Sequence, residues 1–317
     1  MPSRIVISED LWVNLPEGFG NGRTVVYDPS LVGDRQRLLR LGPDTEALIV
    51  RNQTRVDEEL LENFPNLRIV GRLGVGLDNI DLTACQRRGI PVVSARGFNA
   101  NAVAEYVMAC LLQHVRPLFR WNEAVRRGAW DRMAAMGEEV YGKTLGLIGI
   151  GDIGQRVATR ARAMGLTVVA YDPFILPSHS VVRDVGVALI SLDDLLRSSH
   201  FVSVHVPLTD TTRHLLNGPA LAKMREDSVL INTSRGGIVD EDALAEVLVN
   251  FPTRFAYLDV RSTEPPGPDD RLRSLDNVCL TPHIAGITVE SSHEVAWFVL
   301  TQVMEQLEGR KAMGIVP

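Results

Sequence analysis

The stretch TLGLIGIGDIGQRVATRARAMGLTVVAYDP, residues 144–173, decides the fold class of this chain. Gly149, Gly151 and Gly154 follow a short apolar run, and an amphipathic segment comes next. A second apolar run ends in Asp172, close to the offset of about 20 residues at which dinucleotide-binding folds place an acidic residue. The order of strand, glycine-rich turn, helix, strand and acid therefore predicts a parallel α/β sheet with a nucleotide at the turn.

Each residue of this motif has a physical role. Gly149 allows the tight turn, Gly151 lets backbone N–H groups approach a pyrophosphate, and Gly154 permits close packing of helix on strand. The N-terminus of the helix adds positive potential. Asp172 can accept hydrogen bonds from a ribose diol, and its charge would repel a 2′-phosphate, so the motif favours NAD over NADP. The simpler alternative is a strand-to-helix turn whose glycines only relieve crowding.

Short apolar runs alternate with helix-like segments along nearly the whole chain, which predicts doubly wound parallel sheets. We expect an NAD-binding domain over 101–286, beginning with one long helix over 101–120. A final helix over 289–309 would return to a discontinuous substrate domain of 1–100 plus 287–317. The apolar runs of the first series are RIVIS, TVVYD, ALIV, LRIVG and IPVVS; those of the second are LGLIG, TVVAYD, VALI, FVSVHV, SVLINT, FAYLDV and NVCLTP.

Composition excludes several classes of protein. The formal net charge is −6, and a nucleic-acid partner would require a basic face. The three cysteines lie far apart in sequence and form no CxxC pair, so neither a metal site nor a disulfide framework is predicted. No apolar segment is long enough for a signal peptide or a membrane span. A soluble, cytoplasmic protein with no membrane partner is expected.

Three side chains suited to catalysis follow successive predicted strands. Arg235 lies in INTSRGGIVD (231–240), Glu264 in LDVRSTEPP (258–266) and His283 in LTPHIAG (280–286). Open α/β sheets bind ligands at the carboxyl ends of their strands. Each residue also has an ordinary explanation, as a surface charge, part of a turn, or a core histidine.

Together, these three side chains make a chemically sensible set. An arginine fork binds a carboxylate through two hydrogen bonds. A histidine titrates near neutral pH and can take a hydroxyl proton as hydride leaves. A neighbouring carboxylate would favour the imidazolium form and fix its tautomer. The set predicts oxidation of a hydroxy acid.

At this point the sequence resembles a known family. The motifs IGIGDIGQRVA, YDP, HVPLT, LINTSRGGIVDEDAL, LDV…EP and TPHIAG occur in order, and GRLGVGLDNID precedes them. Together they are similar to those of the NAD-dependent D-2-hydroxyacid dehydrogenases. The resemblance implies two Rossmann- or flavodoxin-like domains with the active site in the cleft between them. It also implies a homodimer formed through the cofactor domain.

The resemblance further implies roles for individual residues. Arg235 would hold the substrate carboxylate and polarise the C2 oxygen, with His283 as general acid/base and Glu264 as its partner. Backbone N–H groups at Val75 and Gly76 would also hold the carboxylate. Further contacts are implied for the cofactor by Asp152, Ile153, His205, Pro207, Thr233 and Asp259, the last with the nicotinamide amide, and for the substrate by Asn99.

Substrate identity depends on arginines in the first domain. Arg51 in ALIVRNQTRV and Arg72 in IVGRLGVG are predicted to lie just after strands. Similar arginines bind the distal phosphate in 3-phosphoglycerate dehydrogenases, and GAWDRMAAMG (128–137) resembles a segment that lends an arginine, here Arg132, across the dimer. We therefore expect a 3-phosphoglycerate-like substrate with a distal anionic group. (S)-Sulfolactate, hydroxypyruvate and glyoxylate remain as alternatives, as do plain surface charges.

Two other classes of function stay open on the sequence. One is a corepressor-like protein of the same fold that senses NAD(H) without needing turnover. The other is a dehydrogenase for formate or phosphite, which would need no pocket for a second anion.

Overall fold

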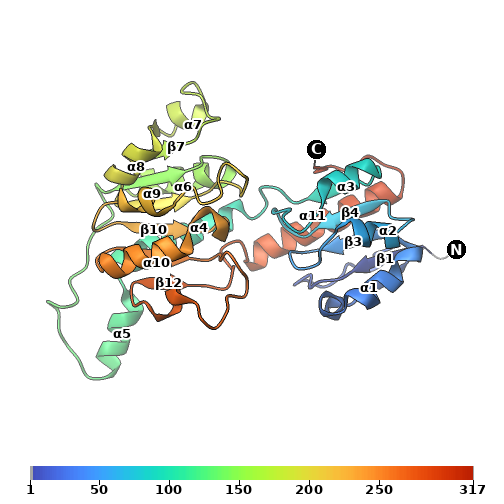
Figure 1. Ribbon diagram of the computed structural model, residues 1–317, viewed down its shortest axis with the longest axis horizontal. Helices are drawn as coiled ribbons and strands as arrows, with labels where there is room; N and C mark the ends of the chain where they lie inside the picture. Colours follow the sequence, from blue (N-terminus) through green and yellow to red (C-terminus); the bar gives the residue numbers. More distant parts are fainter. Residues whose placement is uncertain (1–2, 317) are drawn as a thin grey trace. The chain divides into compact units, whose positions relative to one another are not determined.

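The computed structural model describes residues 3–316. The chain divides into two compact units, Met1–Asn99 with Ile287–Pro317 and Ala100–Gly286. Each unit is built on one sheet of parallel strands with helices packed around it (Figure 1). The predicted class, doubly wound parallel α/β, is confirmed.

The first unit has a five-stranded sheet in the order β2-β1-β3-β4-β5, and every pair is parallel. Aspartates begin its short helices: the side chains of Asp34, Asp57 and Asp81 accept backbone N–H groups in the first turns. The strands are β1 Arg4–Ile7, β2 Thr24–Tyr27, β3 Thr45–Val50, β4 Ile69–Arg72 and β5 Val92–Ser94; the helices are η1 Pro29–Gly33, α1 Arg35–Leu41, η2 Gly42–Asp44, α2 Glu58–Asn63 and α3 Leu82–Arg87.

The last helix, α11 Val289–Leu307, packs on this first sheet. Thr288 and Ser291 form a capping box at its start. Val299 and Val303 lie so close to Gly71 of β4 that a Cβ there would come within 2.8 Å of each of them. The C-terminal helix thus covers strands formed near the N-terminus.

The second unit has seven parallel strands in the order β12-β11-β10-β9-β6-β7-β8. β6 pairs with both β7 and β9, so the strand order reverses there, and such switch points hold ligands in open α/β sheets. The strands are β6 Thr144–Ile148, β7 Thr167–Tyr171, β8 Ala188–Leu189, β9 Phe201–Val204, β10 Val229–Asn232, β11 Phe255–Leu258 and β12 Val278–Leu280. The helices are α4 Ala100–Val115, α5 Leu118–Arg126, α6 Asp152–Ala163, α7 Ser180–Arg183, α8 Leu192–Ser198, α9 Gly218–Ala222, η3 Gly236–Ile238, α10 Glu241–Asn250 and η4 Arg271–Ser274.

The single helix predicted over 101–120 is wrong in one respect. α4 ends at Val115, and α5 begins at Leu118, after Pro117. Proline has no N–H to donate and clashes with the preceding turn, so the helix breaks there. α5 buries none of its residues and extends away from the rest of its unit (Figure 1).

Candidate active site

The glycine-rich loop between β6 and α6 has the shape of a phosphate cradle. Gly149 has φ +90°, and a Cβ there would lie 2.8 Å from the carbonyl oxygen of His205. A Cβ at Gly154 would lie 2.5 Å from the carbonyl oxygen of Gly149, so helix and loop touch through these glycines. In contrast, a Cβ at Gly151 would meet no atom of the described chain within 4 Å. The loop therefore packs tightly against the protein at Gly149 and Gly154, and has open space for a ligand at Gly151.

The first turn of α6 leaves its donors to a ligand. Gly151 is the N-cap and provides no side-chain cap, so the N–H groups of the turn that begins with Asp152 and Ile153 are available to an anion. Asp172, just after β7, accepts the N–H of Ile150 at 3.0 Å and that of Phe174 at 2.9 Å. The acidic residue expected to bind the ribose thus also fixes the glycine loop.

Two further residues after strands β9 and β10 fit a bound cofactor. Thr233 is buried, and its Oγ1 has no hydrogen-bond partner in the described chain. Buried hydroxyls normally have a hydrogen-bond partner, so this one suits a polar group of a ligand.

Burial lowers the pKa of His205 to about 3, and its Nε2 lies 2.9 Å from Ser203 Oγ. His205 is consequently neutral at physiological pH. It is therefore less suited than the predicted residue His283 to carry a proton. Pro207 is exposed just beyond it.

His283 and Glu264 form a direct pair. Nδ1 of His283 lies 2.7 Å from Oε2 of Glu264, and the side chains are 37% and 33% exposed, so a substrate can reach them. His283 has φ +57°, a left-handed conformation that is uncommon outside glycine and is often found at functional sites. Its backbone N–H is held by the carbonyl of Asp259 at 2.8 Å.

The environment of Glu264 keeps its carboxylate ionised. Burial by itself would raise its pKa, but the hydrogen bonds from His283 and from the Arg261 N–H, with the charges of His283 and Arg235, lower the pKa below its ordinary value. Because Arg235 acts on this carboxylate electrostatically, the three predicted catalytic side chains lie near one another at the ends of β10, β11 and β12.

Arg235 is presented by a well-ordered turn after β10. Asn232 donates from Nδ2 to the carbonyl of Arg235 at 2.9 Å and accepts the N–H of Ser234 at 3.1 Å. One guanidinium nitrogen of Arg235 donates to the carbonyl of Ser234 at 2.6 Å. Asn232 in this role was not identified from the sequence.

Asp259, predicted to contact the nicotinamide amide, is buried. Its buried carboxylate accepts from Thr281 Oγ1 at 2.6 Å and from the N–H groups of Ile284 and Ala285 at 2.8 Å each. The Thr281 hydroxyl lies 2.5 Å from that of Tyr106. Asp259 therefore anchors the loop that carries His283.

In the first unit, Arg51 lies at the end of β3, as predicted. It donates to the carbonyls of Asp10 and Leu11 at 3.0 and 3.2 Å, and its guanidinium stacks 3.5 Å from the ring centroid of Trp12. Burial lowers its pKa to about 10, so it remains cationic at neutral pH. The carboxylate of Glu9 accepts the N–H of Arg51 and of the three residues after it, which fixes this loop.

The prediction that Arg72 follows a strand is wrong, because Arg72 is the last residue of β4 and is buried. The apolar run read as the strand simply continues through the arginine. Its side chain curls over Gly74, where a Cβ would collide with it, and donates to the carbonyl of Leu73 at 2.6 Å. Arg72 thus borders the turn that carries Val75 and Gly76.

The remaining predicted residues are less constrained. Asn99 is half-buried at the end of the first unit. Arg132 is exposed on the segment after α5.

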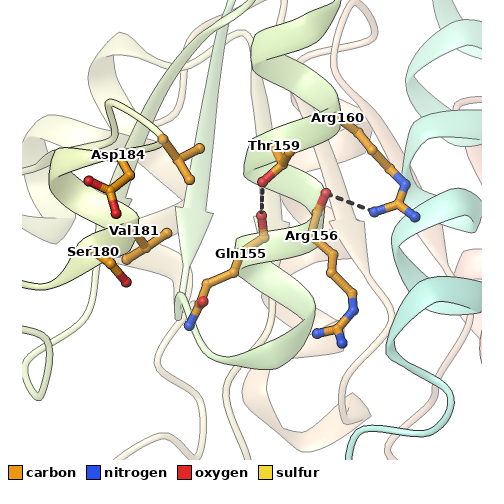
Figure 2. A pocket seen from close by; sticks show the side chains of 8 residues that line it. Gln155, Arg156, Thr159, Arg160, Ser180, Val181 and Asp184 are labelled. Atoms are coloured by element: carbon orange, nitrogen blue, oxygen red, sulfur yellow. Dashed lines mark hydrogen bonds between the residues drawn. The ribbon is translucent and has the colours of Figure 1, made fainter.

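An open hollow lies on the flank of α6, where it faces α7, and not at the catalytic side chains. Gln155, Arg156 and Thr159 line it from α6, with Ser180 and Val181 opposite (Figure 2). Within residues 3–316, no group of three or more His, Cys, Asp and Glu side chains could hold a metal, and no helix is long and apolar enough to cross a bilayer.

Comparison with known proteins identifies the family of this chain. The model of the D-isomer specific 2-hydroxyacid dehydrogenase NAD-binding domain matches residues 108–285. The chain is 46% identical to the (S)-sulfolactate dehydrogenase of Chromohalobacter salexigens, covering 92% of each chain. It is 40% identical to the hydroxypyruvate reductase of Thermotoga maritima over 86% of this chain and 89% of that one. It is 42% identical over 87% of its length to the D-3-phosphoglycerate dehydrogenase of Archaeoglobus fulgidus, of which it spans 52%.

Solved structures agree. The TT0316 protein of Thermus thermophilus superposes with a TM-score of 0.88 at 32% identity, over 99% of this chain and all of that one. The D-lactate dehydrogenase of Aquifex aeolicus, solved with NAD and lactic acid, gives a TM-score of 0.83 at 28% identity, over 97% and 96% of the two chains. The chain belongs to the NAD-dependent D-2-hydroxyacid dehydrogenase family: it is an oxidoreductase whose cofactor is NAD and whose substrate is a small 2-hydroxy or 2-oxo acid.

Proposed function

We propose that the protein interconverts a 2-hydroxy acid carrying a distal anionic group with its 2-oxo acid. The observation that carries the proposal is the pair of arginines at the ends of neighbouring strands, Arg51 after β3 and Arg72 at the end of β4. Two permanent positive charges at the ends of neighbouring strands suit an anion in addition to the carboxylate that Arg235 would bind. The unit of Met1–Asn99 and Ile287–Pro317 is then the substrate domain.

The distal group is a phosphate, as in 3-phosphoglycerate, or a sulfonate, as in sulfolactate. Both present a cluster of oxygens to an arginine. The 46% identity to an (S)-sulfolactate dehydrogenase, over 92% of each chain, favours the sulfonate. A phosphate monoester gains a second charge near pH 6, whereas a sulfonate keeps one charge. KM for a phosphate substrate should therefore change around pH 6, whereas KM for a sulfonate substrate should not change for this reason.

The chemistry follows from the side chains after β10 to β12. Arg235 pairs with the substrate carboxylate and polarises the oxygen on C2. Because Nδ1 of His283 faces Glu264, Nε2 is the nitrogen available to take the hydroxyl proton in oxidation and return it in reduction. The chemistry that bound NAD would supply is acceptance of the hydride that leaves C2. The carboxylate of Glu264 stabilises His283 while it carries the proton.

The cofactor is held by the glycine loop and by the side chains that follow β7, β9 and β10. The N–H groups at Asp152 and Ile153 would meet the pyrophosphate, and Asp172 the ribose. Thr233, with its unused buried hydroxyl, is the next contact, together with His205 and Pro207.

The proposal includes a homodimer formed through the cofactor domain. Support comes from large apolar side chains exposed on and after α5, a kind of patch that usually marks an interface. Arg132 lies on the same segment and would reach the partner's substrate. Phe119→Asp should lower the molar mass measured by light scattering, whereas Val249→Asp, at an exposed apolar position on α10, should not. The exposed side chains are Leu118, Phe119, Val125, Trp130, Met133, Met136 and Tyr141.

Substrate identity is tested by initial rates of NADH formation at mildly alkaline pH. The panel is 3-phosphoglycerate, both enantiomers of sulfolactate, glycerate, lactate and malate. Strong preference for sulfolactate or 3-phosphoglycerate is expected. Preference for glycerate or lactate would refute the role of Arg51 and Arg72. Absence of turnover with every 2-hydroxy acid and every matching 2-oxo acid would leave an NAD-sensing protein instead.

A further inference from the structure

A buried ion-pair cluster lies behind the catalytic pair. Arg261, three residues after β11 ends, donates two parallel hydrogen bonds to Asp270, at 2.6 and 2.8 Å, and one to Glu241 at 2.9 Å. The side chains of Arg261 and Asp270 are each only 7% exposed. Hydrogen bonding to Asp270 raises the pKa of Arg261, and the same bond lowers the pKa of Asp270, so both stay charged. Such buried two-pronged pairs fix geometry as well as charge.

This cluster connects directly to Glu264. The backbone N–H of Arg261 donates to Oε1 of Glu264 at 2.9 Å, while the other oxygen, Oε2, faces His283. The next N–H, that of Ser262, donates to Oε1 of Glu241 at 2.6 Å. These bonds fix the start of the loop that bears Glu264. The side chain of Arg261 attaches it to Asp270 and to Glu241, the first residue of α10, and the N–H of Ser262 adds a second bond to Glu241.

The backbone of Arg261 and Ser262 also packs against the turn that carries Arg235. Gly236 packs against the backbone of Arg261 and Ser262 so closely that a Cβ would collide with it. A shift of the Arg261 backbone would therefore disturb the arginine turn as well as the carboxylate. The position of Arg261 therefore affects both Glu264 and Arg235, two of the three side chains of the proposed reaction.

We infer that Arg261, held by Asp270 and Glu241, is a positioning residue that sets Glu264 against His283. The inference rests on the proposed function of that pair as proton carrier. The charged and titratable groups facing Glu264 are His283 after β12, Arg235 after β10, and Arg261 on its own loop. Arg261 touches neither substrate nor cofactor in this account and acts through Glu264.

The test compares Arg261→Lys with Glu264→Gln and with Arg271→Lys. Lysine keeps the charge but loses the planar fork, so the loop loosens without leaving two buried carboxylates unpaired. We expect kcat for reduction to fall roughly 10-fold, the lower end of what outer partners of active groups are worth. KM should stay nearly constant, and the pH at which the reduction rate is half-maximal should move down, in the direction produced by Glu264→Gln. Asp270→Asn should give the same pattern more weakly.

Arg271→Lys is the matched control, because Arg271 lies ten residues further along the chain, at the start of η4, and its side chain is 54% exposed. Unchanged kinetics in Arg261→Lys, or a loss of kcat without movement of the pH profile, would overturn the inference.

A second readout needs neither cofactor nor turnover. Hydrogen exchange of the Arg261 and Ser262 amides should quicken in Arg261→Lys and stay slow in Arg271→Lys, because these N–H groups bond to Glu264 and Glu241. Quickened exchange in a protein without turnover would reject the proposed function and leave the positioning role standing. Unchanged exchange would reject the positioning role even in an active enzyme.

Discussion

The carboxyl ends of the two parallel sheets hold their charged side chains in different ways. After β10 to β12, the proposed catalytic groups are held by one another and by the backbone: His283 pairs with Glu264, and Glu264 accepts the N–H of Arg261. At the ends of β3 and β4, Arg51 instead donates to carbonyls of the loop that follows β1, and Arg72 donates to the carbonyl of the next residue, Leu73.

This difference indicates which side chains must be positioned precisely. A proton carrier must lie within hydrogen-bond distance of the reacting oxygen, so its loop is held from several sides. A distal anion needs positive charge, and an arginine that donates to carbonyl groups retains its charge. The first sheet is therefore the region in which substrate preference can change without loss of the chemistry.

Replacing His283 should have the largest effect. His283→Gln removes the proton carrier, and kcat should fall on the order of 10²- to 10⁴-fold, as general acid–base groups typically contribute. Binding of NADH, followed by its fluorescence, should stay within a few-fold because the glycine loop is untouched. An active His283→Gln enzyme would assign proton transfer to another group.

Arg235→Lys should come next. The ammonium keeps the charge but loses the two-pronged contact with the carboxylate, and lost hydrogen bonds to a charged group correspond to about a 10- to 100-fold decrease in kcat/KM. The measurement is kcat/KM for the best 2-oxo acid at constant pH. An equal rate in the lysine variant would mean that Arg235 acts only as a point charge.

Arg51→Met and Arg72→Met sharpen the comparison between the two sheets. Each should raise KM about 10-fold for a substrate with a distal anion, because one charged contact is lost, and should change KM for lactate or glycerate much less. Equal changes for both kinds of substrate would show that these arginines only support the fold, as formate- or phosphite-type chemistry would require.

Asp172→Asn should have the smallest effect. It removes the charge that disfavours a 2′-phosphate and weakens the bond to Ile150 N–H, so the Kd for NADH should rise a few-fold, on the order of one hydrogen bond. The preference for NADH over NADPH should narrow at the same time. A variant with unchanged preference would separate Asp172 from cofactor choice.

Much of this fold was predictable because the period of apolar residues and the glycine spacing are local signals. The strand ends that carry Arg235, Glu264 and His283 were found in the same way. Sequence spacing cannot reveal that Asp270 and Glu241 converge on Arg261, since that depends on the packing of α10 against a loop 20 residues later. It also could not show that Arg72 is buried within its strand.

The account is tested most directly by the pH dependence of the two reaction directions. Reduction needs His283 protonated and oxidation needs it neutral, so the reduction rate should fall with rising pH while the oxidation rate rises. Because the pKa of Glu264 is lowered, its carboxylate stays ionised through this range and does not cause the change in rate. Opposite trends that disappear in His283→Gln are the predicted result. Parallel profiles in the two directions would contradict the assignment of His283 as the group that carries the proton.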